Sequence, residues 1–165
     1  MLYMSEVNAI EKDFQIRIAD KKDVPDLFSL IKELAEYEKL LHEVTGTEKD
    51  LEKYLFDPEH KVAEALIVKI HSGESIALAL YFYNFSTFQT KPGIYLEDIY
   101  VKPEYRNQGI GKKLFERIKQ RANEKNCGRI EWSVLDWNTP SIEFYKNSMG
   151  AKAMDEWTTY RLEQF

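Results

Sequence analysis

Several residue types on which whole classes of protein depend are scarce in this sequence. It has 165 residues but a single cysteine, Cys127, so no disulfide forms within the chain, which fits a reducing compartment. The three histidines, His42, His60 and His71, have no metal-ligand spacing, and we predict no metal site. The longest apolar run, Ile76 to Tyr83, is far too short to span a bilayer, so we expect no membrane partner.

Basic residues are also not in excess. The chain has 23 lysines and arginines against 28 acidic residues, which gives a formal net charge of −5. Because duplex-binding domains present a basic face, we do not expect nucleic acid as a partner. A negative field attracts cations, protonated amines included, although solubility alone explains the same charge. The first residues lack the basic start and apolar middle of a signal peptide, so we expect a cytoplasmic protein.

No repeat, low-complexity tract or linker divides the sequence. The composition, 44% hydrophobic and 31% charged, is that of an ordinary globular protein. The length is that of one domain. We therefore expect a single domain over residues 1–165, in which residues 1–12 form a flexible N-terminal extension.

Alternating and helical spacings of apolar residues predict elements in the order β-α-α-β-β-β-α-β-α-β-β. The predicted strands are 14–18, 63–70, 75–85, 94–101, 129–135, 152–154 and 158–162, and the predicted helices are 24–35, 47–54, 109–125 and 139–149. Thr47 with Asp50 resembles a helix cap, and the turn 72–74 joins two strands in an antiparallel hairpin. A β-α-β unit follows. The fold class is therefore predicted to be α/β, with a mixed, mostly antiparallel sheet and helices on both faces.

A glycine-containing loop, 106–112, lies between a predicted strand and a predicted helix. Glycine lets the backbone approach a ligand closely, and the N–H groups at a helix start form a ready site for pyrophosphate. The loop is not an NTPase phosphate loop, because Arg106 and Lys113 stand where glycine and Ser or Thr are required. It is not the dinucleotide fingerprint either, since Leu114 replaces the third glycine. An ordinary strand-to-helix turn explains the glycines equally well.

Six short motifs, in order and with nearly the family's spacing, resemble the GNAT acetyltransferase superfamily, and more closely its diamine branch, the spermidine/spermine and thialysine acetyltransferases. The motifs are 30–38, 47–51, 95–101, 109–111, 137–141 and 144–146, within a resemblance that covers about residues 14 to 151. The resemblance implies a single-domain GNAT fold, acetyl-CoA as cosubstrate, a small amine as substrate and a homodimer. It assigns no role to the tail 155–165.

By resemblance, strand backbone groups pair with the pantetheine arm of acetyl-CoA, as an added strand would. The loop 107–112 then holds the pyrophosphate, and two polar residues near the last helix contact CoA. The implied cofactor-binding residues are Ile99, Tyr100, Val101, Asn107, Gln108, Gly109, Ile110, Gly111, Lys112, Asn138, Ser141 and Tyr145. Arg106 or Lys112 would add charge near phosphate, unless each is a solvated surface cation.

Two residues match the family's catalytic groups. By resemblance, Tyr145 matches the general acid. A phenol has a pKa near ~10, so at neutral pH it holds the proton that a departing thiolate needs. Glu97 matches the carboxylate that acts on the amine through water. An alkylamine is mostly protonated at pH 7, and freeing its lone pair costs roughly 4 kcal/mol. The alternative for Tyr145 is a core tyrosine whose hydroxyl has a hydrogen-bond partner. The alternative for Glu97 is a charged residue at the end of a strand. The implied reaction is direct attack of the amine on the thioester.

Substrate contacts are also implied by resemblance alone. They are Tyr37, Glu38, Ser86, Thr87, Glu97, Glu131, Trp132 and Ser133. Ser86-Thr87 stands where the spermidine/spermine enzymes carry Asp-Pro-Trp, and Ser-Thr is what the thialysine-preferring relatives carry. We therefore expect lysine-like or thialysine-like amino acids and short diamines to be preferred over long polyamines. The rival hypotheses are a GNAT enzyme for another amine and a non-catalytic acyl-CoA-binding module.

Overall fold

The computed structural model describes residues 14–163, and the predicted extension 1–12 lies outside the described residues. The chain divides into two compact units, one up to Trp132 and one from Ser133 onward. That the two units form a single domain stays a prediction. No helix within residues 14–163 is both long and apolar enough to cross a membrane.

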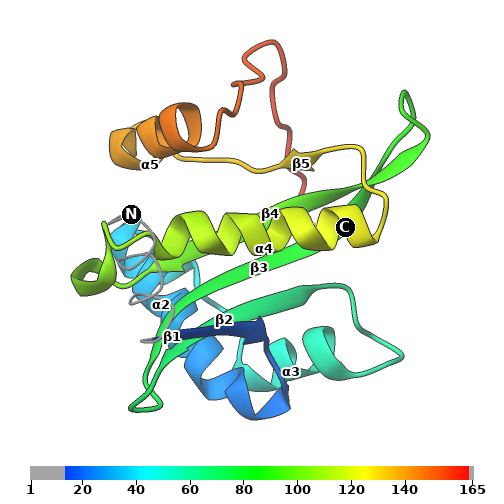
Figure 1. Ribbon diagram of the computed structural model, residues 1–165. Coiled ribbons are helices and arrows are strands. Elements are labelled where there is room, and N and C mark those ends of the chain that lie inside the picture. The colour runs from blue at the N-terminus through cyan, green and yellow to red at the C-terminus, as the bar shows by residue number, and fades with distance from the viewer. Residues whose placement is uncertain (1–13, 164–165) are drawn as a thin grey trace. The chain divides into compact units, whose positions relative to one another are not determined.

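The first unit is built on a sheet whose strands lie side by side in chain order (Figure 1). The strands are β1 (Phe14–Ile18), β2 (Glu64–Ile70), β3 (Ser75–Ser86), β4 (Lys91–Val101) and β5 (Ile130–Glu131). The first four pair antiparallel, and β5 pairs with β4 in parallel. This confirms the predicted mixed, mostly antiparallel sheet, and the predicted hairpin is the β2–β3 pair.

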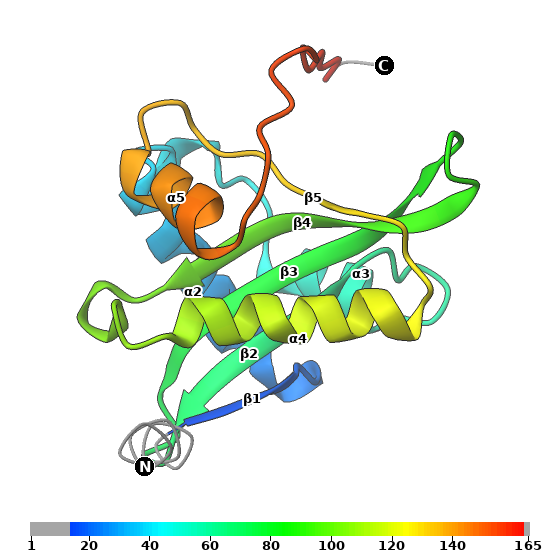
Figure 2. The same cartoon turned by 45° about the horizontal axis from the view of Figure 1, so that its top comes forward.

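Helices cover both faces of this sheet, as predicted (Figure 2). The helices of the first unit are α2 (Val24–Tyr37), α3 (Glu48–Phe56) and α4 (Ile110–Glu124), with 3₁₀ turns η1 (Lys21–Asp23), η2 (Leu41–Glu43) and η3 (Pro103–Tyr105). Ala65 and Ile67 of β2 belong to the core cluster formed with α2 and α3. Glu64, which alternates with them, instead pairs with Arg121 of α4 at 2.8 Å. Successive side chains of β2 therefore face opposite sides of the sheet, one covered by α2 and α3 and the other by α4.

Local sequence signals account for where these helices begin. Thr47 accepts a hydrogen bond from the Asp50 backbone N–H, and Asp50 accepts one from the Thr47 backbone N–H, so the predicted cap of α3 is present as a capping box. Pro25 lies in the first turn of α2, where backbone N–H groups have no acceptor within the helix, so proline costs no helical hydrogen bond there. Buried Leu27 and Leu30 then direct one face of α2 toward the sheet.

Two sequence predictions about strands need correction. The segment 86–93 was predicted as a polar connection, but β3 continues to Ser86 and β4 begins at Lys91, so only a tight turn separates them. The predicted strand 129–135 is reduced to Ile130–Glu131, which pairs with Ile94 and Tyr95 of β4. Apolar alternation does not determine where backbone pairing ends, because pairing also depends on the neighbouring strand.

The second unit contains a short helix, α5 (Thr139–Glu143), followed by a π turn, η4 (Phe144–Ser148). The predicted helix 139–149 is therefore present but interrupted in its hydrogen-bond pattern. The predicted strands 152–154 and 158–162 are wrong, since residues 151–163 form no strand. A strand needs backbone partners, and the described part of this unit contains no other strand to supply them.

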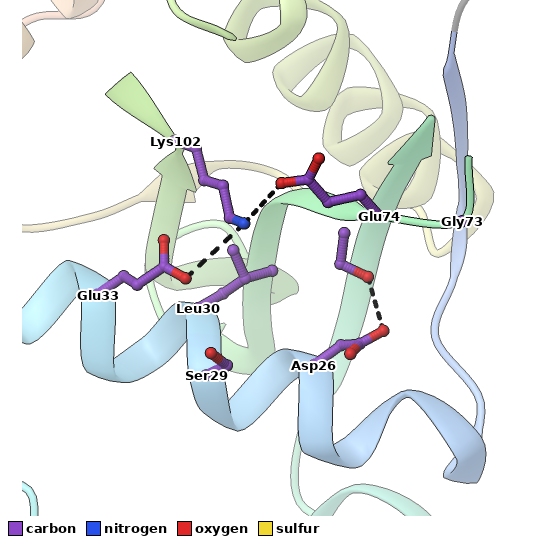
Figure 3. A pocket seen from close by; sticks show the side chains of 8 residues that line it. Asp26, Ser29, Leu30, Glu33, Gly73, Glu74 and Lys102 are labelled. Carbon is purple, nitrogen blue, oxygen red and sulfur yellow. Dashed lines mark hydrogen bonds and ion pairs between the residues drawn. The ribbon is translucent and has the colours of Figure 1, made fainter. Parts of the chain in front are cut away.

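A small pocket of about 180 Å³ opens beside α2, near the β2–β3 turn (Figure 3). Its charged groups are largely paired with one another: Lys102 lies 2.9 Å from Glu74 and 3.9 Å from Glu33. Asp26 accepts a hydrogen bond from Ser75 at 2.8 Å. None of the predicted site residues lines this pocket, so we do not assign it to the candidate site.

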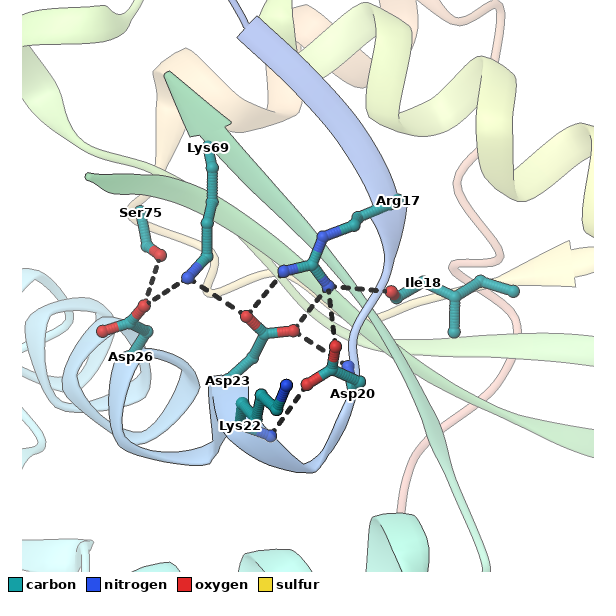
Figure 4. A network of polar contacts seen from close by, with 8 residues as sticks. All are labelled: Arg17, Ile18, Asp20, Lys22, Asp23, Asp26, Lys69 and Ser75. Carbon is teal, nitrogen blue, oxygen red and sulfur yellow. Dashed lines mark hydrogen bonds and ion pairs between the residues drawn. The ribbon is translucent and has the colours of Figure 1, made fainter. Parts of the chain in front are cut away.

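A charged network joins β1, η1, α2 and β2 (Figure 4). Asp23 is 1% exposed. It accepts hydrogen bonds from Arg17 at 2.6 and 2.8 Å, and Lys69 lies 3.1 Å away. Burial opposes the charged carboxylate, but the bonds from Arg17, the Asp20 backbone and Lys69 outweigh it and lower the pKa of Asp23 from 3.8 to about 2. The network therefore requires an ionised Asp23.

We predict that this carboxylate stabilises the fold in a defined pH window. Because the pKa of Asp23 is lower in the folded state, its contribution is full above about pH 4 and is lost as the pH falls toward 2. The contribution amounts to about 2 kcal/mol. Urea unfolding between pH 6 and pH 2 should show a gap between wild type and Asp23→Asn that narrows over that window. Asp155→Asn, at an exposed site, should follow the wild-type profile. A gap independent of pH would contradict the prediction.

Candidate active site

β4 carries a one-residue bulge in its middle. Leu96 lies opposite Tyr81 and Asp98 lies opposite Leu80, so Glu97 has no partner on β3. The side chain of Glu97 is exposed, whereas Asp98 is half-buried. A bulge bends its strand and redirects side chains, and bulges are frequent beside active sites. Here it sets two consecutive carboxylates in different environments.

A third carboxylate, that of Glu38, influences Asp98. Glu38 directly follows Tyr37, the last residue of α2. Burial, followed by the charges of Glu97 and Glu38, raises the pKa of Asp98 to about 7. Burial also raises the pKa of Glu38. No ion pair is formed by any of the three within residues 14–163. This carboxylate cluster (Glu38, Glu97 and Asp98) therefore favours a cationic ligand.

Beyond the bulge, β4 has backbone groups that β5 does not use. β5 pairs with β4 only at Ile94 and Tyr95 within the described residues. Lys102 donates its backbone N–H to Ile76 on β3 at 2.9 Å. Because amides alternate between the two edges of a strand, Tyr100 also faces β3, and the amides of Ile99 and Val101 face the other edge. Ile99 and Val101 are thus the residues whose backbone fits the predicted ligand pairing, while the Tyr100 backbone belongs to the sheet.

The glycine loop leads into a helix start that lacks a side-chain cap. Asn107 and Gly109 have positive φ values, 61° and 81°, which turn the chain into α4. Gly109 is the N-cap residue and offers no side chain to the helix amides, and the first turn contains no acidic residue. Lys112 adds positive charge at the positive end of the helix dipole. A bound anion would satisfy both the free amides and this charge.

In the second unit the predicted residues cluster around α5. Asn138 is buried and is the N-cap of α5, where its Oδ1 atom accepts a hydrogen bond from the Ser141 N–H at 3.4 Å. Tyr145 lies in the π turn, in which the Met149 N–H donates to the Phe144 carbonyl at 3.2 Å. π turns are rare and often occur at functional sites. Sequence periodicity did not indicate this turn, because it assumes regular helical spacing throughout.

Four other predicted substrate contacts have local roles in the first unit. Glu131 lies 2.9 Å from Arg129 and accepts from Asn84 at 3.3 Å, so its charge is matched. Trp132 packs edge-on against Phe115, with 5.1 Å between ring centroids.

Ser86 and Thr87 lie at the β3–β4 turn, where Ser86 accepts from the Gln89 N–H at 3.3 Å. Lys91 pairs with Ser86, and from Lys91 to Glu97 β4 extends by about 20 Å at ~3.3 Å per residue. The structure therefore does not bring Ser86 and Thr87 to the carboxylate cluster. Ser133, the last predicted contact, begins the second unit.

Asp98 is the member of the cluster that sequence reasoning did not select. Resemblance selected Glu97 alone. Asp98 directly follows Glu97 at the bulge, and the charges of Glu97 and Glu38 both raise its pKa. The only signal in the sequence is the adjacent pair of acids in an otherwise apolar strand. Within residues 14–163 no group of His, Cys, Asp or Glu side chains is arranged to hold a metal ion, and the predicted absence of a metal site stays a prediction.

Comparison with known proteins relates this geometry to a family. A family model described as "Acetyltransferase (GNAT) family" matches residues 28–151. The thialysine N-epsilon-acetyltransferase of Bos taurus is 39% identical, over 90% of this chain and 91% of that protein. An L-ornithine N5-acetyltransferase of Arabidopsis thaliana is 30% identical, over 90% of this chain and 83% of that one. An aminoglycoside acetyltransferase from a soil metagenome, 19% identical over 93% of this chain and 99% of that chain, shares the fold with a TM-score of 0.77.

We predict that the carboxylate cluster destabilises the fold at alkaline pH. The pKa of Asp98 is raised in the folded state, so stability falls as the pH rises from about 4 through about 7. Asp98→Asn resembles the protonated acid and avoids this loss. Its melting temperature should therefore exceed that of wild type at pH 8 and equal it near pH 3. Asp155→Asn, which is exposed, serves as the matched control. A difference that stays constant over this range would show that Asp98 is already ionised at low pH.

Proposed function

This chain belongs to the acetyltransferase (GNAT) family, and we propose that it transfers the acetyl group of acetyl-CoA to a primary amine of a small cationic substrate. The observation that carries this proposal is the cluster of Glu38, Glu97 and Asp98 at the β4 bulge, which has no basic partner among the described residues. A protonated amine would pair with these carboxylates through charge-assisted hydrogen bonds. The adjoining strand edge and glycine loop suit the cosubstrate.

Acetyl-CoA would be held mainly by backbone groups. Ile99 and Val101 direct their amides to the edge of β4 that β5 leaves unpaired, which suits the amides of the pantetheine arm. The uncapped start of α4, after Gly109, suits the pyrophosphate. Further contacts are proposed for Asn138 and Ser141 on resemblance. When bound, the cosubstrate supplies an activated acetyl group as a thioester.

The amine must lose its proton before it attacks the thioester carbon. We assign Glu97 as the group that accepts this proton through water, because it is exposed at the bulge. Asp98 lies in the same cluster, and its pKa of about 7 suits proton exchange at neutral pH. As the carbon–sulfur bond breaks, Tyr145 donates its phenolic proton to the departing thiolate. The products are the N-acetyl amine and free CoA.

Within this class we propose thialysine-like or lysine-like amino acids and short diamines as preferred substrates. Support comes from relatives named for thialysine and ornithine, at 39% and 30% identity. The turn Ser86-Thr87 lies away from the carboxylate cluster along β4, so within one copy of the chain it gives this preference no geometric support. We also propose that the protein is a homodimer, by resemblance to the family, and that it is cytoplasmic, from its sequence.

An amine panel with acetyl-CoA tests the proposed function. Release of CoA thiol should be measured with thialysine, lysine, ornithine, putrescine, spermidine and an aminoglycoside. We expect the highest kcat/KM for a lysine-like amino acid, because the cluster binds a compact cation. A spermidine value far above the thialysine value would overturn the preference. Acetyl-CoA binding without thiol release from any amine would indicate a non-catalytic acyl-CoA-binding module.

Tyr145→Phe tests the assignment of the general acid. The substitution removes only the donated proton, so kcat should fall by about 10²-fold or more while the affinity for acetyl-CoA changes little. Tyr160→Phe removes a hydroxyl at a site that is 91% exposed and is the matched control. Steady-state kinetics with calorimetric acetyl-CoA binding separate the two effects. An undiminished kcat would mean that water or another group protonates the sulfur.

A further inference from the structure

The side chain of Arg106 is held at three points. Its guanidinium carbon lies 4.6 Å from the ring centroid of Tyr37 and 5.7 Å from that of Tyr100. Its Nε atom donates a hydrogen bond to the Val101 carbonyl at 2.9 Å. The side chain is half-buried. Arg106 is therefore a fixed part of the first unit and not a solvated surface cation.

These contacts join two parts of the candidate site. Arg106 directly precedes the loop 107–109 that leads into α4. Tyr37 is the last residue of α2 and is followed by Glu38 of the carboxylate cluster. Tyr100 is only 5% exposed, and its hydroxyl donates to Glu33 on α2 at 3.4 Å, so one ring in the stack is firmly anchored. The guanidinium thus links the cosubstrate loop to the end of α2.

The contact depends on a planar cation. Arginine stacks on aromatic rings through its flat guanidinium, while lysine provides a point charge without that face. Arg–aromatic contacts at partly buried sites change an equilibrium by about 2-fold to 30-fold. An effect of this size, acting on Tyr37, is large enough to alter the position of Glu38.

We propose that Arg106 is a positioning residue for amine binding, which fixes Tyr37 and with it Glu38 relative to the glycine loop. This inference rests on the proposed function. It differs from the simpler role of Arg106 as a phosphate contact, because it places the main effect of Arg106 on the amine and not on acetyl-CoA. The carbonyl of Val101 and the two rings account for the observed orientation of the side chain.

A double-mutant cycle tests the proposal. Arg106→Lys keeps the charge, and Tyr37→Leu removes the ring. We expect Arg106→Lys to raise the amine KM by about 3-fold to 30-fold, with acetyl-CoA affinity within about 2-fold of wild type. The same change in the Tyr37→Leu background should have no further effect, whereas in the Tyr37→Phe background, which keeps the ring, it should have its full effect. Arg117→Lys, on α4 beside Gln120, controls for arginine replacement as such.

The outcomes separate the alternatives. If Arg106→Lys weakens acetyl-CoA binding and leaves the amine KM unchanged, Arg106 is a phosphate contact and the proposal is wrong. It is also wrong if the effect persists in full without the Tyr37 ring. A melting temperature that falls in step with the KM change would indicate a merely structural role. If wild type binds the amine but does not acetylate it, the proposed function fails, and calorimetric amine affinities still decide the role of Arg106.

Discussion

The bulge at Glu97 is the constraint on which the rest of the site depends. Before it, the Ile94 N–H points toward β5 and donates to Arg129. After it, the amides of Ile99 and Val101 face that edge. The extra residue has therefore moved the edge-facing amides from even-numbered to odd-numbered residues. Asp98 and Tyr100, two residues apart and both after the bulge, lie on one face of β4. Without the bulge, a regular β4 would not direct carboxylates, edge amides and the Tyr100 ring to these positions together.

Two aspartates, the buried Asp23 and the half-buried Asp98, show how the groups around a carboxylate determine its pKa. Asp23 accepts hydrogen bonds from Arg17, and its pKa falls to about 2. Asp98 forms no ion pair within residues 14–163, and burial, followed by the charges of Glu97 and Glu38, raises its pKa to about 7. The first arrangement stabilises the scaffold that holds β1, α2 and β2 together. The second opposes folding above about pH 4, and the proposed binding of a cationic amine would account for it as a trade of stability for activity.

Much of the scaffold follows from local rules, whereas the site does not. Helical spacing indicated α2 and α4, and the Thr47 cap indicated α3, because these signals lie within one element. The π turn at Tyr145 and the bulge at Glu97 are departures from regular spacing, so periodicity cannot reveal them. The stack of Arg106 on Tyr37 joins residues far apart in the chain, and only the packed fold brings them together. Resemblance to a family selected Glu97 but missed Asp98, since motif matching does not report electrostatic coupling.

The raised pKa of Asp98 also bears on a conflict within the proposed reaction. A carboxylate cluster binds the ammonium form of a substrate, yet only the neutral amine attacks the thioester. Moving a proton from an amine of pKa about 10 to a carboxylate of ordinary pKa near 4 costs about 8 kcal/mol, at ~1.36 kcal/mol per pKa unit. Moving it to a group whose pKa is about 7, as for Asp98, costs about 4 kcal/mol. In the proposed reaction, the burial of Asp98 and the nearby charges of Glu97 and Glu38 would serve both demands: the carboxylate cluster attracts the cation, and the raised pKa makes Asp98 a better proton acceptor than an ordinary carboxylate.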